Sequence, residues 1–211
     1  MLCIILIAAP AAGKGTISKY IEEKYNYKHI SMGDLLRDEV KNETEIGLMI
    51  KPLIEKGSLV DDDVIEDIFK REFKKTKENI VLDGLPRTIS QARMLDKLDE
   101  VYDDVKITKV INIDIDKEIA INRIKSRLIC EDCGFVYNKN IIKENKCTKC
   151  GGNLLSRNDD ALETFLDRYE TFVKQTKPLL NYYGDKVVTI YNNTTLEDVF
   201  KQVDEILKGD E

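Results

Sequence analysis

The chain has 211 residues, of which 34% are charged, and a formal net charge of −6 at pH 7. This acidic balance argues against a general nucleic-acid-binding protein, which carries a net basic face. Apolar runs stay well short of the roughly 20 residues that a membrane span requires. We therefore expect a cytoplasmic protein with neither a nucleic-acid nor a membrane partner, long enough for one α/β domain with inserted lobes.

The chain starts with an apolar run that gives way to small residues and ends in Gly13-Lys14-Gly15-Thr16. A run without alternation is typical of a strand buried on both faces. The helix-competent segment 18–23 follows, so the pattern predicts a strand, a phosphate-binding loop and a helix whose N-terminus attracts anions. Lys14 would lie on the outer phosphates, and the Thr16 hydroxyl would bind a bridging magnesium ion.

This loop matches the Walker pattern G-x-x-x-x-G-K-[ST] imperfectly. Ala8 stands where the first glycine belongs, and Gly15 separates Lys14 from Thr16. A strand followed by an ordinary tight turn is the alternative interpretation. A secretory signal is disfavoured because the run lacks a basic n-region.

A small helical lobe is predicted next. A short strand over 27–30 contains His29, the single histidine, for which we expect a structural role. Ser31 or Asp34 could cap the helix that follows. Helical periodicity over 35–40, 46–55 and 64–73, without a strand between these segments, indicates a lobe of short helices.

A second buried strand, over 79–82, ends in Asp83-Gly84-Leu85-Pro86-Arg87, and a helix follows from 90 to about 98. Ligands of a parallel sheet lie beyond the C-terminal ends of its strands, where Asp83 and Arg87 fall. Asp83 is placed like the acidic residue that holds magnesium through water in phosphoryl-transfer sites. A helix cap is the alternative role for Asp83.

The remaining elements continue the alternation of strand and helix. A strand over 109–113 precedes a helix over 116–128, on which Arg123 and Arg127 would share a face. Beyond the cysteine segment we predict a long helix from 162 to about 182 that carries Arg168. A strand over 187–191 and a helix over 196–207, with Gly209 just beyond its end, complete the chain.

Two CxxC pairs are the second specific signal. Cys130 and Cys133 are separated by thirteen residues from Cys147 and Cys150. Two such pairs complete a closed tetrahedral thiolate site that suits structural zinc. Disulfides are the competing interpretation, which a reducing cytosol disfavours. Cys3, in the first strand, is expected to be a core residue.

These motifs together closely resemble adenylate kinases of the long, zinc-bearing type, and the resemblance covers essentially the whole chain. It rests on the phosphate loop, the four cysteines and three further motifs. These motifs are Gly33-Asp34-Leu35-Leu36-Arg37, Asp83-Gly84-Leu85-Pro86-Arg87-Thr88 and Arg157-x-Asp159-Asp160.

The resemblance implies an α/β P-loop fold of three layers, with a five-stranded parallel sheet and two inserted lobes. The reaction would be ATP + AMP ⇌ 2 ADP with magnesium, and we expect a monomer. The implied divisions are a core of residues 1–30, 61–126 and 161–211, an AMP-binding lobe at 31–60 and a zinc-bearing mobile lid at 127–160.

The resemblance also implies roles for individual residues. Those at the reacting phosphates are Lys14, Asp83, Arg87, Arg123, Arg127, Arg157 and Arg168. Those that bind ATP are Ala11, Ala12, Gly13, Lys14, Gly15, Thr16, Arg127, Val136, Tyr137 and Asn193. Those that bind AMP are Met32, Arg37, Ser58, Leu59, Val60, Gly84, Arg87, Gln91, Arg157 and Arg168.

Three departures from the family pattern bear on turnover and nucleotide preference. Ala8 and Ala11 replace loop glycines, Met32 replaces a threonine that contacts AMP, and the lid lacks a Pro-rich turn between its cysteine pairs. Other functions remain open: a nucleotide sensor with weak turnover, a kinase with a different acceptor base, and a zinc-ribbon nucleic-acid module.

Overall fold

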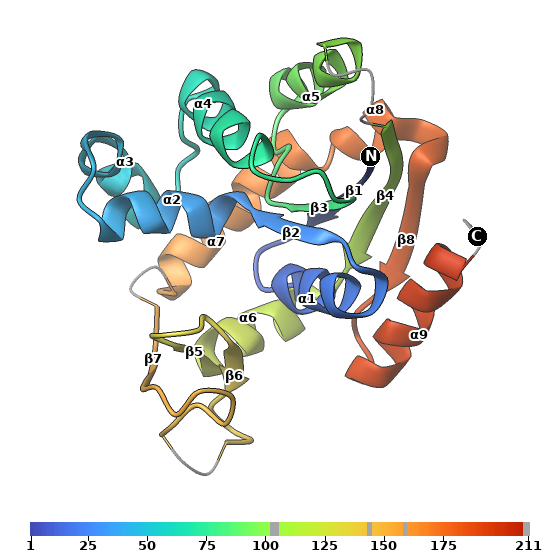
Figure 1. The fold of residues 1–211 in the computed structure, drawn as a ribbon. Coiled ribbons are helices and arrows are strands. Elements are labelled where there is room, and N and C mark those ends of the chain that lie inside the picture. Colours follow the sequence, from blue (N-terminus) through green and yellow to red (C-terminus); the bar gives the residue numbers. More distant parts are fainter. Residues whose placement is uncertain (102–105, 143–144, 158–159, 209–211) are drawn as a thin grey trace.

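A parallel sheet of five strands, in the order β2-β3-β1-β4-β8, forms the centre of the molecule (Figure 1). The computed structural model describes residues 1–101 (the backbone alone from 98), 106–142, 145–157 and 160–208. It confirms the predicted α/β architecture. The strands are β1 (Leu2–Ala8), β2 (Lys28–Ser31), β3 (Ile80–Asp83), β4 (Lys106–Asp114) and β8 (Val187–Tyr191).

The central strand β1 is covered on both faces because it is apolar throughout. Cys3 and Ile5 pack into one cluster of buried residues, whereas Ile4 and Leu6 pack into a second cluster on the opposite face. Successive side chains of a strand point to opposite faces, so a run without alternation buries both. The predicted core position of Cys3 is confirmed, with 2% of its surface exposed.

Helices cover the two faces of the sheet. None in the described part of the chain is long and apolar enough to span a membrane. The first cluster is built with α2 (Met32–Lys41), α3 (Glu45–Glu55), α4 (Asp62–Phe73), α5 (Ile89–Val101) and α8 (Leu179–Tyr183). The second is built with α1 (Lys14–Tyr25), α6 (Lys117–Ser126), α7 (Leu162–Thr171) and α9 (Leu196–Leu207).

Two segments extend from this core. Between β2 and β3 the chain forms α2, α3 and α4; the Ser31 hydroxyl accepts from the Asp34 backbone N–H at the start of α2, as predicted. Between α6 and α7 the chain forms a separate antiparallel sheet in the order β6-β5-β7 (Figure 1). Its strands are β5 (Arg127–Cys130), β6 (Val136–Asn138) and β7 (Leu154–Leu155).

The predicted helix over 116–128 is too long, because α6 ends at Ser126. The Ser126 hydroxyl donates to the Asn122 carbonyl, 2.9 Å away, and Arg127 is extended at φ −74°, ψ 131°. Arg127 pairs with Asn138 of β6, so strand pairing continues where the helical pattern suggested another turn. Arg123 and Arg127 therefore do not share a helix face.

The predicted long helix over 162–182 is also divided. After α7, residues Phe172–Thr176 form a π-helix, and α8 begins at Leu179. Pro178 has no N–H to donate, so the helical hydrogen-bond pattern cannot pass through it unchanged. The wider turn places the buried Thr176 hydroxyl 2.9 Å from the Arg87 carbonyl, to which it donates.

Candidate active site

The loop between β1 and α1 has the geometry of an anion-binding site. Two of its residues have left-handed backbone, Ala11 at φ 61° and Gly13 at φ 90°. The helix begins at Lys14, so its first backbone N–H groups point into the loop. The Lys14 ammonium donates to the Ala8 carbonyl at 3.4 Å. The segment predicted to bind ATP phosphates, Ala11 to Thr16, therefore comprises the end of this loop and the first residues of α1.

Asp83 lies beside this loop. It is the last residue of β3, in register with Leu6 of β1 on one side and Ser31 of β2 on the other. A Cβ placed on Gly15 would lie 3.8 Å from Asp83 Oδ2, so the carboxylate faces the start of α1. Only 9% of Asp83 is exposed. An acidic group at this place suits a magnesium ion that accompanies phosphate.

The charge of Asp83 is maintained by its neighbours. Burial alone would raise the pKa of this carboxyl, but the nearby His29 and the positive charge of Lys14 hold it below its ordinary value. His29 Nε2 lies 3.8 Å from Asp83 Oδ2. The carboxyl is therefore ionised at neutral pH, ready to interact with a cation.

Arginines from distant parts of the chain converge on Lys14. Burial lowers the pKa of Lys14; Asp83 opposes this change, and the positive charges of Arg87, Arg127 and Arg168 add to it. Burial likewise lowers the pKa of the Arg87 guanidinium. Assembling like charges in a partly buried place is unfavourable unless an anion binds there. This cluster therefore has the electrostatics of a polyphosphate site.

Arg37 and Arg157 approach the cluster from its edge. Arg87 interacts electrostatically with Arg37. Burial would raise the pKa of Asp34, but Arg37 and Arg157, together with the Ser31 hydroxyl, lower it. Asp159, in the same motif as Arg157, lies outside the described residues. The charge of Arg157, which follows the small sheet in sequence, therefore acts on Asp34 of α2.

Arg127 is held by an ion pair. Its Nε donates to Asp160 Oδ2 at 2.8 Å, and its Nη2 donates to Asp160 Oδ1. Arg168, on α7, donates from Nη2 to the Ile54 carbonyl at the end of α3, 3.2 Å away. A Cβ on Gly57, at φ 72°, would lie 2.9 Å from Arg168 Cγ, so a glycine is required beside it. These contacts orient both guanidinium groups before any ligand binds.

Arg123, on α6, lies beside Gly13 of the phosphate loop. Its Nη2 donates to the carbonyl and the Oδ1 of Asn192, both at 3.0 Å. Asn193 accepts the Asp116 backbone N–H on Oδ1 at 2.9 Å, and its predicted contact with ATP stays a prediction. Sequence reasoning missed Asn192, because an asparagine after a strand is also what a simple turn would contain.

Several residues predicted to bind AMP surround the start of α5 and the α2–α3 segment. Met32 is 2% exposed and packs in the core, and Val60 is 6% exposed. Gly84 is left-handed at φ 77°, and the Arg87 Nε donates to its carbonyl at 3.1 Å. Ser58 is exposed and Leu59 is half-buried. Their contact with a nucleotide stays a prediction.

The Gln91 side chain is already engaged by the protein. Its Oε1 accepts the Arg87 backbone N–H at 2.7 Å, and its Nε2 donates to Asp62 Oδ1 at 2.8 Å. A primary amide has two N–H groups and two lone pairs, so one of each remains for a base. The predicted reading of adenine by Gln91 would have to use these.

The four predicted metal ligands converge. All four sulfur atoms lie within 4.8 Å of one another. Cys130 Sγ is 3.4 Å from Cys150 Sγ, and Cys133 Sγ is 3.6 Å from Cys147 Sγ. Tetrahedral zinc with Zn–S bonds of about 2.3 Å places sulfurs about 3.8 Å apart, so this donor set fits zinc. The cysteines are free thiols, not disulfides.

Tyr137 lies against the cysteine cluster. Its hydroxyl is 3.3 Å from Cys147 Sγ, and it accepts the Thr148 backbone N–H at 3.0 Å. Burial would raise the pKa of Cys147, but hydrogen bonds from Tyr137 and from the backbone of Cys150 and Lys149 lower it to about 6. A thiol with a lowered pKa is more easily the thiolate that a metal needs.

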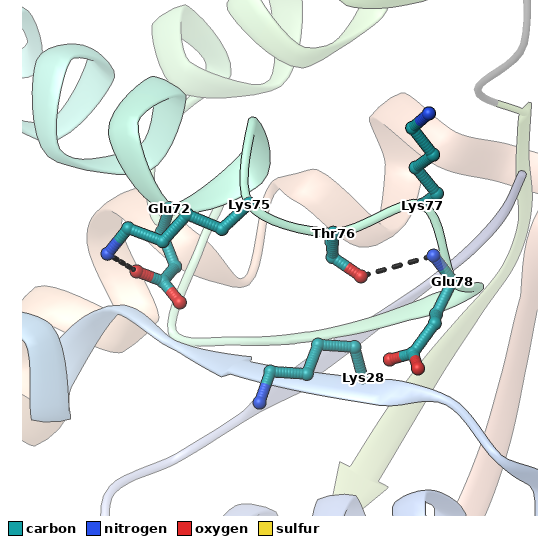
Figure 2. A pocket seen from close by; sticks show the side chains of 6 residues that line it. All are labelled: Lys28, Glu72, Lys75, Thr76, Lys77 and Glu78. Atoms are coloured by element: carbon teal, nitrogen blue, oxygen red, sulfur yellow. Dashed lines mark hydrogen bonds and ion pairs between the residues drawn. The ribbon is translucent and has the colours of Figure 1, made fainter.

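Of two surface hollows, one is lined by residues predicted to bind ATP and the other lies away from the site. One, of about 390 Å³ on the small sheet, is lined by the predicted ATP contacts Val136 and Tyr137 together with Asn138, Ile141, Ile142 and Thr148. The other, of about 430 Å³, lies by Lys28 at the amino end of β2, away from Asp83 (Figure 2). Figure 2 shows the Glu72–Lys75 ion pair in its wall.

A parallel sheet, a phosphate loop with its lysine, an ionised aspartate at a neighbouring strand end and converging arginines define a P-loop phosphotransferase. The family profile described as adenylate kinase matches residues 6–188. The chain belongs to the adenylate kinase family.

Relatives of known name agree over the full chain. An adenylate kinase of Caldicellulosiruptor bescii is 42% identical over 207 residues, which cover 95% of this chain and 96% of that protein. An adenylate kinase of Lactobacillus gasseri is 40% identical and covers 100% of both chains. One of Bacillus cytotoxicus is 40% identical over 98% of each.

Proposed function

We propose that this enzyme catalyses ATP + AMP ⇌ 2 ADP. The observation that carries the proposal is the half-buried cluster of Lys14, Arg87, Arg127 and Arg168 beside the phosphate loop. Phosphoryl transfer needs little covalent help from the protein, so its rate depends on holding two nucleotides in line and neutralising the charge between them. The cluster supplies that charge.

The position of these residues supports the roles that we propose for them. The loop backbone from Gly13 to Thr16 and the Lys14 ammonium bind the phosphates of ATP, and Arg37 with Arg87 binds the phosphate of AMP. The arginines that close over the transferring group are Arg123, Arg127, Arg157 and Arg168. The Thr16 hydroxyl and, through water, Asp83 would hold a magnesium ion, which would supply positive charge to the ATP phosphates.

We also propose that residues 31–60 act as the AMP-binding lobe and 127–160 as a mobile lid on the remaining core. Zinc would be bound by Cys130, Cys133, Cys147 and Cys150 and would have a structural role, because four protein ligands leave no open position for a substrate. A monomeric state and a cytoplasmic location are part of the same proposal.

A coupled assay for ADP formed from ATP and AMP tests the function. A nucleotide sensor would bind ATP but form little ADP. A zinc-ribbon nucleic-acid module would neither bind ATP nor form ADP. Comparing kcat/KM for AMP, CMP and UMP tests the acceptor; we expect AMP to be strongly preferred, because the Gln91 amide complements adenine and not uracil. Equal values would leave a nucleoside monophosphate kinase with another acceptor base.

A further inference from the structure

The phosphate loop contains a conformation that alanine adopts reluctantly. Ala11 has φ 61°, in the left-handed region where a Cβ is too close to the following carbonyl. The cost corresponds to about tenfold in an equilibrium constant. Such a backbone persists only where its surroundings hold it in place. Some contact near Ala11 must therefore favour this turn over a relaxed one.

The side chain of Asn192 contacts the residue next to Ala11. Asn192 follows β8 directly and is 4% exposed. Its Nδ2 donates to the Ala12 carbonyl at 2.8 Å, and its backbone N–H donates to the Asp114 carbonyl, at the end of β4, at 2.9 Å. Asn192 is thus anchored to the sheet by its backbone, and its side chain holds the residue next to Ala11.

The fit between Asn192 and the loop is close. A Cβ built on Gly13 would lie 2.7 Å from Asn192 Nδ2, a distance that real Cβ atoms essentially never show. Gly13 is itself left-handed, at φ 90°. The absence of a side chain at Gly13 therefore opens the path by which the Asn192 amide reaches Ala12.

The oxygen of the same amide holds Arg123. Arg123 Nη2 donates to Asn192 Oδ1 and to the Asn192 carbonyl, both at 3.0 Å. A flipped amide would place Oδ1 against the Ala12 carbonyl and Nδ2 against the guanidinium, so both partners favour the same orientation. One buried side chain therefore connects the phosphate loop with a predicted catalytic arginine.

We propose that Asn192 is a positioning residue for ATP: it stabilises the left-handed turn at Ala11 and ties the phosphate loop to Arg123. Asn192 acts through these groups and need not touch the nucleotide. The inference rests on the proposed function, because it takes the loop to bind the phosphates of ATP. It explains how the loop keeps its shape with alanine where the family has glycine.

A double-mutant cycle tests the proposal. Asn192→Ala is expected to weaken ATP binding or lower kcat by about tenfold, while the KM for AMP stays within about twofold. Ala11→Gly removes the strain, so in the Asn192→Ala background it should recover much of the loss. In the presence of Asn192 the same change should have a smaller effect. The two substitutions should therefore not act independently.

Two further variants separate the contributions. Asn181→Ala is the matched control, because Asn181 is an exposed asparagine on α8 that is not among the residues predicted to bind a nucleotide; its ATP binding should equal that of the wild type. Asn192→Asp keeps an acceptor for Arg123 but loses the donor to Ala12, so it should resemble Asn192→Ala in ATP binding. It also provides a folded comparison if Asn192→Ala is unstable.

Three results would contradict the proposed role of Asn192. Equal effects on ATP and AMP, effects that simply multiply with Ala11→Gly, or an Asn192→Ala protein that matches Asn181→Ala would overturn the proposal. ATP binding is measured by calorimetry on protein whose folding is checked by thermal unfolding. This readout does not require turnover, so a failure of the proposed ADP-forming reaction would be seen separately in the coupled assay.

Discussion

The five-stranded sheet buries apolar side chains on both of its faces, whereas the buried cluster of the three-stranded sheet comprises Cys130, Cys147 and Leu154. The first region can be stabilised by removing apolar surface from water. The second has too little apolar surface for that, and domains of such size usually need a metal or disulfides. We therefore expect the two regions to depend on different sources of stability.

The residues of the candidate site are divided between these two regions. The phosphate loop, Asp83 and Arg87 belong to the region held by apolar burial, and Arg127 belongs to the small sheet. The phosphate-binding part of the site should therefore survive changes that disrupt the small sheet. The predictions below separate the two regions, in order of decreasing effect.

Removing the metal should affect the small sheet far more than the core. We expect one zinc per chain by metal analysis, and its loss after chelation or in Cys133→Ser. Structural zinc sites contribute on the order of 10 kcal/mol to the folding of small modules, so the small sheet should unfold while the main transition remains. Cys3→Ala, outside the cluster, should keep its zinc. An unchanged unfolding profile after complete metal removal would contradict this comparison.

Truncating a large side chain of the five-stranded core should destabilise the core and leave the small sheet largely unaffected. Phe165 is 1% exposed and packs in the second cluster, so Phe165→Ala should lower the free energy of unfolding of the core by about 3–5 kcal/mol. Leu154→Ala, in the small sheet, should leave the core transition in place. Denaturant titrations monitored by tyrosine fluorescence and by zinc release distinguish the two. Equal losses in the core transition would mean that the regions unfold as one unit.

Removing one cluster arginine should reduce catalysis with little effect on folding. Arg87→Ala is expected to lower kcat by roughly 10²–10³-fold, the loss typical of one charge-stabilising donor. Arg93, exposed on α5, is the matched control, and Arg93→Ala should retain full activity. Steady-state kinetics and thermal unfolding are the measurements. A large loss of stability with unchanged kcat would assign Arg87 a structural role instead.

The smallest effect concerns how α9 is attached to α1. Asp204 accepts hydrogen bonds from Tyr20 at 2.7 Å, Lys24 at 2.6 Å and Tyr25 at 2.8 Å. Burial opposes ionisation of Asp204, but these donors lower its pKa to about 2.

Because the pKa of Asp204 is lower in the folded state, its stabilisation is complete above about pH 4 and is lost as the pH falls toward about 2. We expect Asp204→Asn to cost about 1 kcal/mol at pH 6, after solvent screening, and less at pH 3. Asp185→Asn, an exposed aspartate, serves as the control. A cost that does not decline between pH 6 and pH 3, measured by chemical denaturation, would rule out this linkage.

Local patterns in the sequence were enough to predict much of this molecule. The strand over 187–191 and the helix over 196–207 agree with the structure residue for residue, because their periodicity and their flanking turn residues are local. The two CxxC pairs predicted a thiolate cluster for the same reason, since each pair lies within one short turn. The loop at Lys14 and the strand end at Asp83 were also found, because each follows an uninterrupted apolar strand.

Only the tertiary structure decided where distant segments meet. Arg127 belongs to β5 because β6 pairs with it, although the helical pattern continued through it. The π-helix after α7 and the contact from Thr176 to Arg87 join residues far apart in the chain. Asn192 reaches the phosphate loop from the last strand of the sheet. Periodicity reports which face of an element is buried, but a hydrogen bond between segments depends on strand order and packing, which no local pattern contains.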